Sequence, residues 1–358
     1  MIDYTGWGKE YLENKQEYLK LFDRVMQKEQ ERNIEFLEKS ILESLYGETD
    51  RKYAVAVANG TDALHFALKS LGIKSGDEVL TSNFSWISTA SCITMAGATP
   101  VFCDIDPNTY HMSLESIRRM YQPEVKAIVY PHLFGSMSET KEILEFCKEK
   151  NIAFIEDACQ SLGSSFNGIK AGTIGDVSTL SFNANKPVAG IAGGGAFLTD
   201  DKEQADLVRK LRRHGNNEVL GYNSKMLLFN AEFINFRLKK ISEWQDRRQA
   251  VAKRYDSNLQ DIPVIVQPTP NGLNHCYHKY VIRLIDKRTR DLLKTRLKAD
   301  VHYSKPIPEN EMYKSIIHRK DEGVNCKKIT DTVLSLPIHP YVTDEEVDKI
   351  CSIIMMTV

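Results

Sequence analysis

The chain has 358 residues, of which 42% are hydrophobic and 27% charged, a composition typical of a globular protein with one large and one smaller domain. Its formal net charge of −1 provides no overall positive field, which argues against a nucleic-acid partner. No apolar run is long enough to span a membrane, and the seven cysteines are scattered without a CxxC pair, so we expect a cytoplasmic protein with reduced thiols and no membrane partner.

The first fifty residues are rich in charged and helix-forming side chains. The stretch EYLENKQEYLKLFDRVMQKEQERNIEFLEKSILESLY contains no proline or glycine. It predicts one or two surface helices, and we assign residues 1–52 to an N-terminal helical segment.

From Tyr53 onward, short apolar runs rich in β-branched residues recur along the chain. They are YAVAVANG, DEVLTS, ATPVFCDID, VKAIVYPHLFG, IAFIEDACQ, DVSTLSFN and GAFLTD, and the first two are followed by the helical patterns TDALHFALKSLG and SWISTASCITMAG. Strands that alternate with helices predict an α/β fold with a mostly parallel sheet covered by helices. In such sheets the functional residues gather where strands end and turns begin.

The sequence pattern changes again near Leu259. After a long helical pattern that runs through Tyr255, the proline-containing segment DIPVIVQPTPNGLN leads into a strand candidate, YHKYVIRLID, and two helix candidates, TRDLLKTRLKA and TDEEVDKICSIIMM. We therefore predict a large α/β domain over residues 53–258 and a small α+β domain over residues 259–358.

Lys186 stands between the strand candidate VSTLSF and the glycine-rich stretch GIAGGGAFLTD. A lysine is ordinarily a solvated surface residue, so a chemical role needs partners. A lysine amine forms a Schiff base with a carbonyl group, and the cofactor pyridoxal phosphate (PLP) carries one. A protein that binds PLP must also hold its phosphate, protonate its ring nitrogen and cover its ring.

Candidates for these tasks follow successive strands. Thr61 and Asp62 lie at a strand-to-helix turn where backbone N–H groups bind phosphate, and Ser181 precedes Lys186 by five residues. Asp157, directly after an apolar strand, suits the ring nitrogen, with Gln160 near the ring hydroxyl and Trp86 over the ring. Taken alone, the Thr61 and Asp62 pair is better explained as an ordinary helix start, Asp157 slightly better as a strand-end turn residue, and Trp86 equally well as a core tryptophan. Their order along one predicted sheet favours the cofactor interpretation.

These stretches resemble the PLP-dependent nucleotide-sugar aminotransferases of the DegT/StrS type, which have the aspartate-aminotransferase fold (PLP fold type I). The likeness runs from about Tyr53 to the C-terminus and is carried by AVAVANGTDALHFAL, GDEVLTSNFSWISTA, IEDACQSLGSSFNGIKAG, GDVSTLSFNANK and GYNSKM. The resemblance implies that PLP is bound covalently to Lys186 as an internal aldimine and that Asp157 pairs with the ring nitrogen. It implies a cofactor-binding set of Gly60, Thr61, Asp62, Trp86, Asp157, Gln160, Ser181, Lys186 and Asn223. Asn223 would reach the phosphate of the neighbouring subunit, so the resemblance implies a homodimer with shared active sites.

The resemblance further implies that an amino group moves from L-glutamate to a keto-sugar nucleotide, in amino-sugar or polysaccharide biosynthesis. Relatives that aminate C3 often show a GxYGDGGA pattern after the lysine, and its absence here favours a nucleotide-linked 4-keto-6-deoxy sugar. A 3-keto sugar, a keto-cyclitol and a PLP-binding regulatory protein without turnover remain alternatives.

Three departures from the family pattern bear on these alternatives. Lys225 replaces the usual arginine of the GYN-x-R-M motif, the glycine-rich loop lacks its acidic residue, and the segment LKADVHYSKP is altered.

Other chemistries find less support. Related sugar dehydratases carry histidine at the position of Lys186, and no GxGxxG motif for a nicotinamide cofactor occurs in the chain. The histidines show no metal-ligand spacing such as HExxH, so we expect no metal site.

Overall fold

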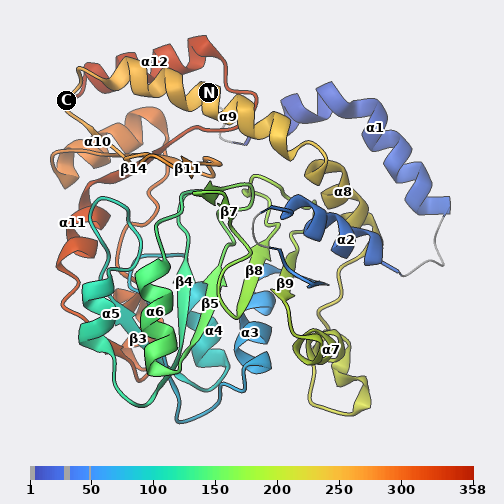
Figure 1. Cartoon of the computed structure of the whole chain (residues 1–358). Coiled ribbons are helices and arrows are strands. Elements are labelled where there is room, and N and C mark those ends of the chain that lie inside the picture. The colour runs from blue at the N-terminus through green and yellow to red at the C-terminus, as the bar shows by residue number, and fades with distance from the viewer. Residues whose placement is uncertain (1–4, 28–32, 48–49) are drawn as a thin grey trace.

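The structure, a computed structural model, describes residues 5–27, 33–47 and 50–358. Its centre is an eight-stranded sheet with the order β1-β9-β8-β5-β4-β2-β3-β13 (Figure 1). The strands are β1 (Tyr53–Val57), β2 (Glu78–Ser82), β3 (Thr99–Cys103), β4 (Val125–Pro131), β5 (Ala153–Asp157), β8 (Val177–Ser181), β9 (Gly195–Thr199) and β13 (Arg319–Lys320). Among them, β9 alone runs in the direction opposite to the other strands. The predicted α/β fold with a mostly parallel sheet is confirmed, and all seven predicted strands of the large domain lie in this sheet.

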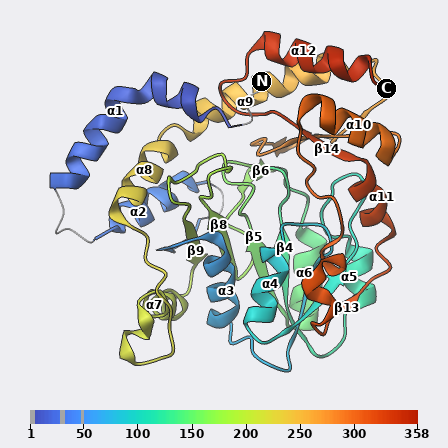
Figure 2. The same ribbon diagram turned by 180° about the vertical axis from the view of Figure 1, so that it is seen from behind.

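Helices cover both faces of the sheet because its strands are apolar on both sides. In β1, Ala54 and Ala56 pack into one core while Val55 and Val57 pack into the other, as the two-residue period of a strand requires. One face is covered by α3 (Gly60–Ser70), α4 (Ser88–Met95) and α7 (Lys202–Leu211), of which α3 and α4 lie in front of the sheet in Figure 2. The other face is covered by α2 (Glu35–Ser44), α5 (Leu114–Met120), α6 (Lys141–Lys150) and α8 (Leu228–Leu238).

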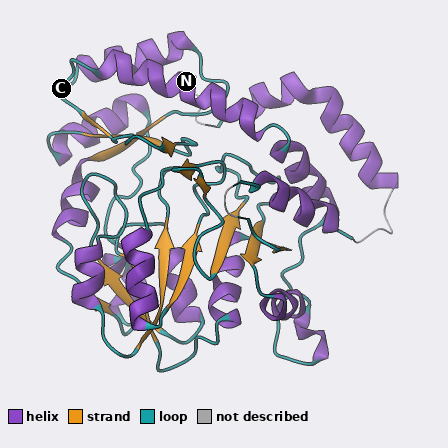
Figure 3. Ribbon diagram, viewed as in Figure 1, coloured by secondary structure: helices purple, strands orange, loops and turns teal. Residues whose placement is uncertain are grey.

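The N-terminal segment forms α1 (Trp7–Gln27) and α2. Leu37 and Ile41 of α2 are fully buried in the core of the large sheet, and the carboxylate of Glu38 accepts hydrogen bonds from Ala56 N (3.0 Å) and from Arg212 (2.7 Å). The helix α2 is therefore an integral part of the sheet's cover, whereas α1 lies farther out beside α8 (Figures 1 and 3).

The C-terminal region surrounds a second sheet with the order β10-β12-β14, formed by β10 (Ile265–Val266), β12 (Tyr280–Arg283) and β14 (Val333–Leu336). Its core is shared with α9 (Ile241–Leu259), α10 (Lys287–Leu297) and α12 (Asp344–Met355). The helical pattern through Tyr255 is thus divided between α8 and α9, and Tyr255 packs in this second core. The predicted domain boundary at residue 258 stays a prediction.

Small elements complete the chain. They are α11 (Val324–Thr332), the 3-10 helices η1 (His214–Asn217), η2 (Ile307–Glu309) and η3 (Glu311–Lys314), and a small sheet of β6 (Ser165–Phe166), β7 (Ile169–Lys170) and β11 (Leu273–Asn274). None of the helices in the described ranges has the length and apolarity that a membrane span needs.

Candidate active site

Three parallel strands of the large sheet, β1, β5 and β8, direct their carboxyl ends to one edge, where ligands bind in open α/β sheets. A cavity of about 280 Å³ opens at this edge. Seven of the nine predicted site residues line it, namely Gly60, Thr61, Trp86, Asp157, Gln160, Ser181 and Lys186. Asp62 and Asn223 do not.

Asp157 ends β5 and faces the cavity, and its side chain is held in one orientation. Its carboxylate accepts hydrogen bonds from Thr89 Oγ1 (2.8 Å) and from the backbone N–H of Cys159 (3.2 Å). The preceding residue, Glu156, points to the opposite face of the strand, where it accepts hydrogen bonds from Gly172 N and Ile174 N (2.8 Å each). The two-residue period of β5 therefore separates a structural carboxylate from one that faces the cavity.

The turn between β1 and α3 has the features of a phosphate site. Asn59 caps α3 by accepting a hydrogen bond from Asp62 N (2.8 Å), and Gly60 and Thr61 belong to the first helical turn, whose N–H groups have no acceptor within the helix. A Cβ on Gly60 would lie 2.8 Å from the Cβ of Ser181, so the turn and Ser181 are in direct contact. The helix N-terminus and two hydroxyl groups, from Thr61 and Ser181, thus surround a space suited to an anion.

Asp62 has a different environment from Thr61. Its carboxylate accepts hydrogen bonds from Ser224 Oγ (2.6 Å) and Asn59 Nδ2 (3.0 Å), which ties the phosphate turn to the segment that follows η1. Asn223 and Lys225, on either side of Ser224, are exposed. Within one subunit, therefore, neither Asp62 nor Asn223 reaches the cavity.

Lys186 lies on the loop after β8, and its backbone N–H donates to Asn183 O (2.9 Å). Burial in the cleft lowers the pKa of its amine below the usual value, and the nearby Cys159 and Asp157 side chains oppose this shift. A lowered pKa increases the fraction of neutral amine, which is the nucleophilic and proton-accepting form.

The glycine-rich loop after Lys186 brings β9 against the phosphate turn. A Cβ on Gly195 would lie 2.4 Å from Asn59 O, and one on Gly190 would lie 2.1 Å from Gly193 O. The backbone of Gly194 adopts a φ of +134°, which side chains disfavour. The altered loop of this chain is therefore closely packed against itself, and the strand that follows it is closely packed against the turn that faces the cavity.

Gln160 lies in the buried part of the cavity, whereas Trp86 lies at its rim. The buried Gln160 accepts a hydrogen bond from Phe134 N and donates one to Tyr303 Oη, both at 3.0 Å. Trp86 is 58% exposed at the rim, with its ring centroid 6.4 Å from that of Tyr303. The exposed indole is placed where it can cover a flat ligand.

Sequence reasoning missed several residues that line the cavity, among them Thr89, Cys159, His278, Lys279, His302 and Tyr303. The last two belong to the altered segment LKADVHYSKP. Burial lowers the pKa of His302 to about 3, and its Nδ1 lies 2.9 Å from Ser335 Oγ, so the ring is neutral at physiological pH. Thr89 could have been noticed in the sequence, because it is a hydroxyl residue that closely follows Trp86 at the start of a helix.

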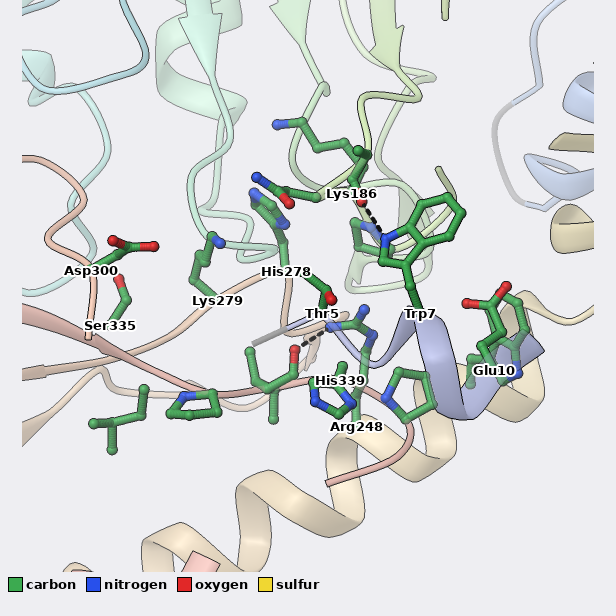
Figure 4. A pocket seen from close by; sticks show the side chains of 18 of the residues that line it. Thr5, Trp7, Glu10, Lys186, Arg248, His278, Lys279, Asp300, Ser335 and His339 are labelled. Atoms are coloured by element: carbon green, nitrogen blue, oxygen red, sulfur yellow. Dashed lines mark hydrogen bonds between the residues drawn. The ribbon is translucent and has the colours of Figure 1, made fainter. Parts of the chain in front are cut away.

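A second cavity of about 100 Å³ lies on the other side of Lys186 (Figure 4). Trp7 of α1 borders it and donates a hydrogen bond from Nε1 to Ala184 O (3.1 Å). Glu10 and Arg237, which form a buried ion pair, also line it. Lys186 stands where the two cavities meet, because the lining residues that they share are Asn185, Lys186, His278, Lys279 and His302.

The sequence profile of the DegT/DnrJ/EryC1/StrS aminotransferase family matches residues 13–355. The chain belongs to this family. It is 32% identical over 315 residues to the UDP-N-acetyl-3-dehydro-alpha-D-glucosamine 3-aminotransferase of Acidithiobacillus ferrooxidans, covering 85% of this chain and 84% of the relative. It is 31% identical to the dTDP-4-dehydro-2,3,6-trideoxy-D-glucose 4-aminotransferase of Saccharopolyspora spinosa (83% and 82% covered). It is also 31% identical to a protein named as a pleiotropic regulatory protein in Geobacillus stearothermophilus (97% and 95% covered).

Solved structures agree with this membership. The structure of S. venezuelae DesV in complex with a ketimine intermediate superimposes with a TM-score of 0.93 at 26% identity, covering 99% of this chain and 98% of the other. That of NtdA from Bacillus subtilis with bound cofactor PMP gives a TM-score of 0.86 at 26% identity, with 96% and 82% covered. The protein is therefore a sugar aminotransferase with the fold of this family, and its cofactor is PLP. The residues at the cavity fit that cofactor, because an amine, a single oriented carboxylate and a phosphate turn meet there.

Proposed function

We propose that this aminotransferase moves the amino group of L-glutamate to C4 of a nucleotide-linked 4-keto-6-deoxy sugar. The observation that carries the proposal is the convergence of Lys186, Asp157 and the turn at Gly60 and Thr61 in one cavity. PLP, when bound, supplies an electron sink for the carbon that loses a proton. The chain must supply attachment, orientation and proton transfer, and these three groups are suited to those tasks.

Each residue has a task that its surroundings favour. The first turn of α3 and the hydroxyls of Thr61 and Ser181 hold the phosphate, while the Asp157 carboxylate keeps the ring nitrogen protonated. Thr89 fixes that carboxylate through its 2.8 Å hydrogen bond. Lys186 anchors the cofactor and, when released, carries the proton between substrate and cofactor carbons, a role that its lowered pKa supports.

The choice of C4 rests on the loop after Lys186. Relatives of nearly equal identity have names that specify a 3-aminotransferase and a 4-aminotransferase, so identity alone does not separate the two positions. The loop lacks the GxYGDGGA pattern that relatives aminating C3 often show. A 3-keto sugar and a keto-cyclitol remain the alternatives, and the acceptor test described below distinguishes them from a 4-keto sugar.

We further propose a homodimer whose subunits complete each other's sites. Asn223 is exposed in the single chain and lies next to the exposed side chains of Leu220 (89%) and Tyr222 (37%). Burial of this segment against a second copy would cover apolar surface and bring Asn223 to the partner's phosphate turn. The seven cysteines are all unpaired in the structure, which suits the reducing cytoplasm where we place the enzyme.

The first test is the visible absorbance spectrum of the purified protein with PLP, before and after L-glutamate is added. We expect a yellow band that glutamate bleaches and a keto-sugar nucleotide restores, and we expect Lys186→Ala to lack the lysine-dependent band. The acceptor test uses nucleotide-linked 4-keto and 3-keto sugars with NMR of the products. Nitrogen at C4 supports the proposal, whereas turnover confined to 3-keto sugars or keto-cyclitols overturns it.

A second candidate function is a PLP-binding regulatory protein without turnover. It is favoured by one observation, the 31% identity over nearly the whole chain to a relative named as a pleiotropic regulatory protein. A cofactor band that forms on Lys186 but responds to no amino donor would support this function and contradict the transaminase proposal.

A further inference from the structure

A second lysine, Lys279, stands beside Lys186 in the cleft. It directly precedes β12, and its backbone N–H donates to Phe134 O at 2.9 Å, which fixes the chain at the base of the cleft. Its side chain lines both the 280 Å³ cavity and the 100 Å³ cavity, as does that of Lys186. Figure 4 shows Lys279 between His278 and Asp300, with Arg248 farther along the same wall.

Lys279 has little compensation for its charge. Among the residues that the structure describes, no carboxylate forms an ion pair with its amine, although Asp300 lies at the mouth of the cavity. Burial lowers its pKa to about 8, and the neighbouring charge of Lys186 acts in the same direction while Asp300 opposes it. The amine is thus held in the cleft without a partner, an arrangement that costs free energy unless a ligand supplies one.

The other acidic groups of the cleft are already engaged. Glu10 is paired with Arg237, and Asp157 is held by the Thr89 hydroxyl. Arg248 adds positive charge to the cleft, and its partners are neutral. Its Nη1 donates only to the carbonyls of Tyr277 (3.0 Å) and Ile338 (2.8 Å), and its buried Nε has no partner in the described structure. Lys279 and Arg248 therefore give this part of the cleft two cations, and Asp300 offsets the charge of Lys279 only in part.

We propose that Lys279, with Arg248 behind it, binds a carboxylate of the amino donor. The inference rests on the proposed function, in which an amino acid must place its amine at the cofactor held by Lys186. The carboxylates of L-glutamate then lie within a few bonds of the reacting carbon, and Lys279 is a neighbouring cation that shares the cleft with Lys186. A charge-assisted hydrogen bond to the ammonium group would fix the donor and favour glutamate over uncharged amines.

The test compares Lys279→Met, which keeps the length of the side chain and removes the charge, with Lys279→Arg, which keeps the charge. Lys253→Met is the matched control, because Lys253 is exposed on α9. The readout is the cofactor spectrum during the half-reaction with L-glutamate, without an acceptor. We expect Lys279→Met to raise the glutamate concentration at half-maximal conversion by about tenfold or more, the scale of one charge-assisted hydrogen bond. Lys279→Arg should recover part of this loss, and Lys253→Met should behave as the parent protein.

A parallel measurement with L-alanine shows which carboxylate of glutamate Lys279 binds, because alanine has an α-carboxylate and no second one. Equal losses for alanine and glutamate in Lys279→Met identify the α-carboxylate, and a loss confined to glutamate identifies the side-chain carboxylate. A half-saturation for glutamate within twofold of the parent value overturns the proposal. A rise confined to a keto-sugar acceptor that carries a carboxylate also overturns it, because the anion then belongs to the acceptor.

Calorimetric titration with glutarate, an unreactive dicarboxylate, separates this proposal from the proposed function. Glutarate binding to the PLP-loaded protein that weakens about tenfold in Lys279→Met supports the anion site even if no sugar is turned over. Binding that is equal in the two proteins contradicts it.

Discussion

The side-chain amide of Gln160 donates a hydrogen bond to the hydroxyl of Tyr303 at 3.0 Å, across 143 residues of sequence. The same amide accepts from Phe134 N at 3.0 Å, so both of its ends are fixed. Burial raises the pKa of the Tyr303 hydroxyl, which stays a neutral acceptor at physiological pH. Through this contact, the loop after β5 is joined to the segment between α10 and η2 at the wall of the 280 Å³ cavity.

Tyr303→Phe removes this hydroxyl and leaves the Gln160 amide without its acceptor. We expect the free energy of unfolding to fall by about 1 kcal/mol, the usual net contribution of a buried hydrogen bond. Urea unfolding of the protein without added PLP measures the change. A Gln160→Met variant combined with Tyr303→Phe should lose less than the sum of the two single variants, since both remove the same bond. Strict additivity would contradict the assigned contact.

Thr89 orients the Asp157 carboxylate, which faces the cavity. Thr89→Val keeps the shape of the side chain and removes the donor at 2.8 Å from Asp157. We expect the rate of the glutamate half-reaction to fall by about tenfold, because a hydrogen bond to a charged group contributes about 1.5–3 kcal/mol. Stopped-flow absorbance measures the rate. Thr89→Ser retains the hydroxyl and should stay within about threefold of the parent rate; an equal loss in both variants would point to packing instead.

Gly60 is the residue of the phosphate turn that has no room for a side chain. Gly60→Ala places a Cβ 2.8 Å from the Cβ of Ser181 and must displace one of the two. We expect the dissociation constant for PLP to rise by about tenfold, corresponding to about 1.4 kcal/mol. Equilibrium dialysis with PLP measures it. Gly8→Ala in α1 is the control, since nothing lies within 4 Å of the added Cβ. Unchanged PLP binding in Gly60→Ala would show that the turn does not contact the cofactor.

Buried histidines predict a loss of stability in mild acid. Burial lowers the pKa of His275 to about 3, whereas the unfolded chain has a histidine pKa of about 6.5. Between these values the unfolded state binds a proton that the folded state does not, so stability rises with pH and is lost as pH falls below about 6.5. From pH 6.5 to 5 the expected loss from this residue is about 2 kcal/mol.

His275→Asn tests this assignment, because an amide oxygen can replace Nδ1 as the acceptor for Tyr277 N (2.9 Å). Melting temperatures at pH 7 and pH 5 give the measurement. The variant should lose less on acidification than the parent protein, and parallel losses would exclude His275 as the cause.

The strands of the large sheet were predictable because parallel strands buried on both faces are nearly continuous apolar runs. The direction of β9 was not, since the apolar stretch GAFLT carries the same hydrophobic signal in either orientation. The position of α9 could not be predicted from the sequence, for a related reason. Its pattern continues that of α8, and only the three-dimensional position shows Tyr255 in the second core.

The residues of the candidate site can also be separated into those that the sequence predicts and those that it does not. Lys186, Asp157 and Ser181 were predictable because each follows a strand, and strand ends meet at one edge. Thr89 and Lys279 were not singled out, because their importance lies in contacts across space. The Thr89 hydroxyl reaches a carboxylate 68 residues away, and Lys279 enters the cleft from the position just before β12 of the other sheet. Asn223 stays a prediction, since its role requires a second chain.

The hydrogen bond from Trp7 Nε1 to Ala184 O has a practical consequence. It attaches the start of α1 to the loop two residues before Lys186, and the Arg237 guanidinium stacks 4.2 Å from the centre of the Trp7 ring. A bulky group attached directly before Trp7 would therefore lie close to the loop that carries Lys186. A C-terminal tag, which extends from the far end of α12, is the better choice for purifying this enzyme with its active centre undisturbed (Figure 1).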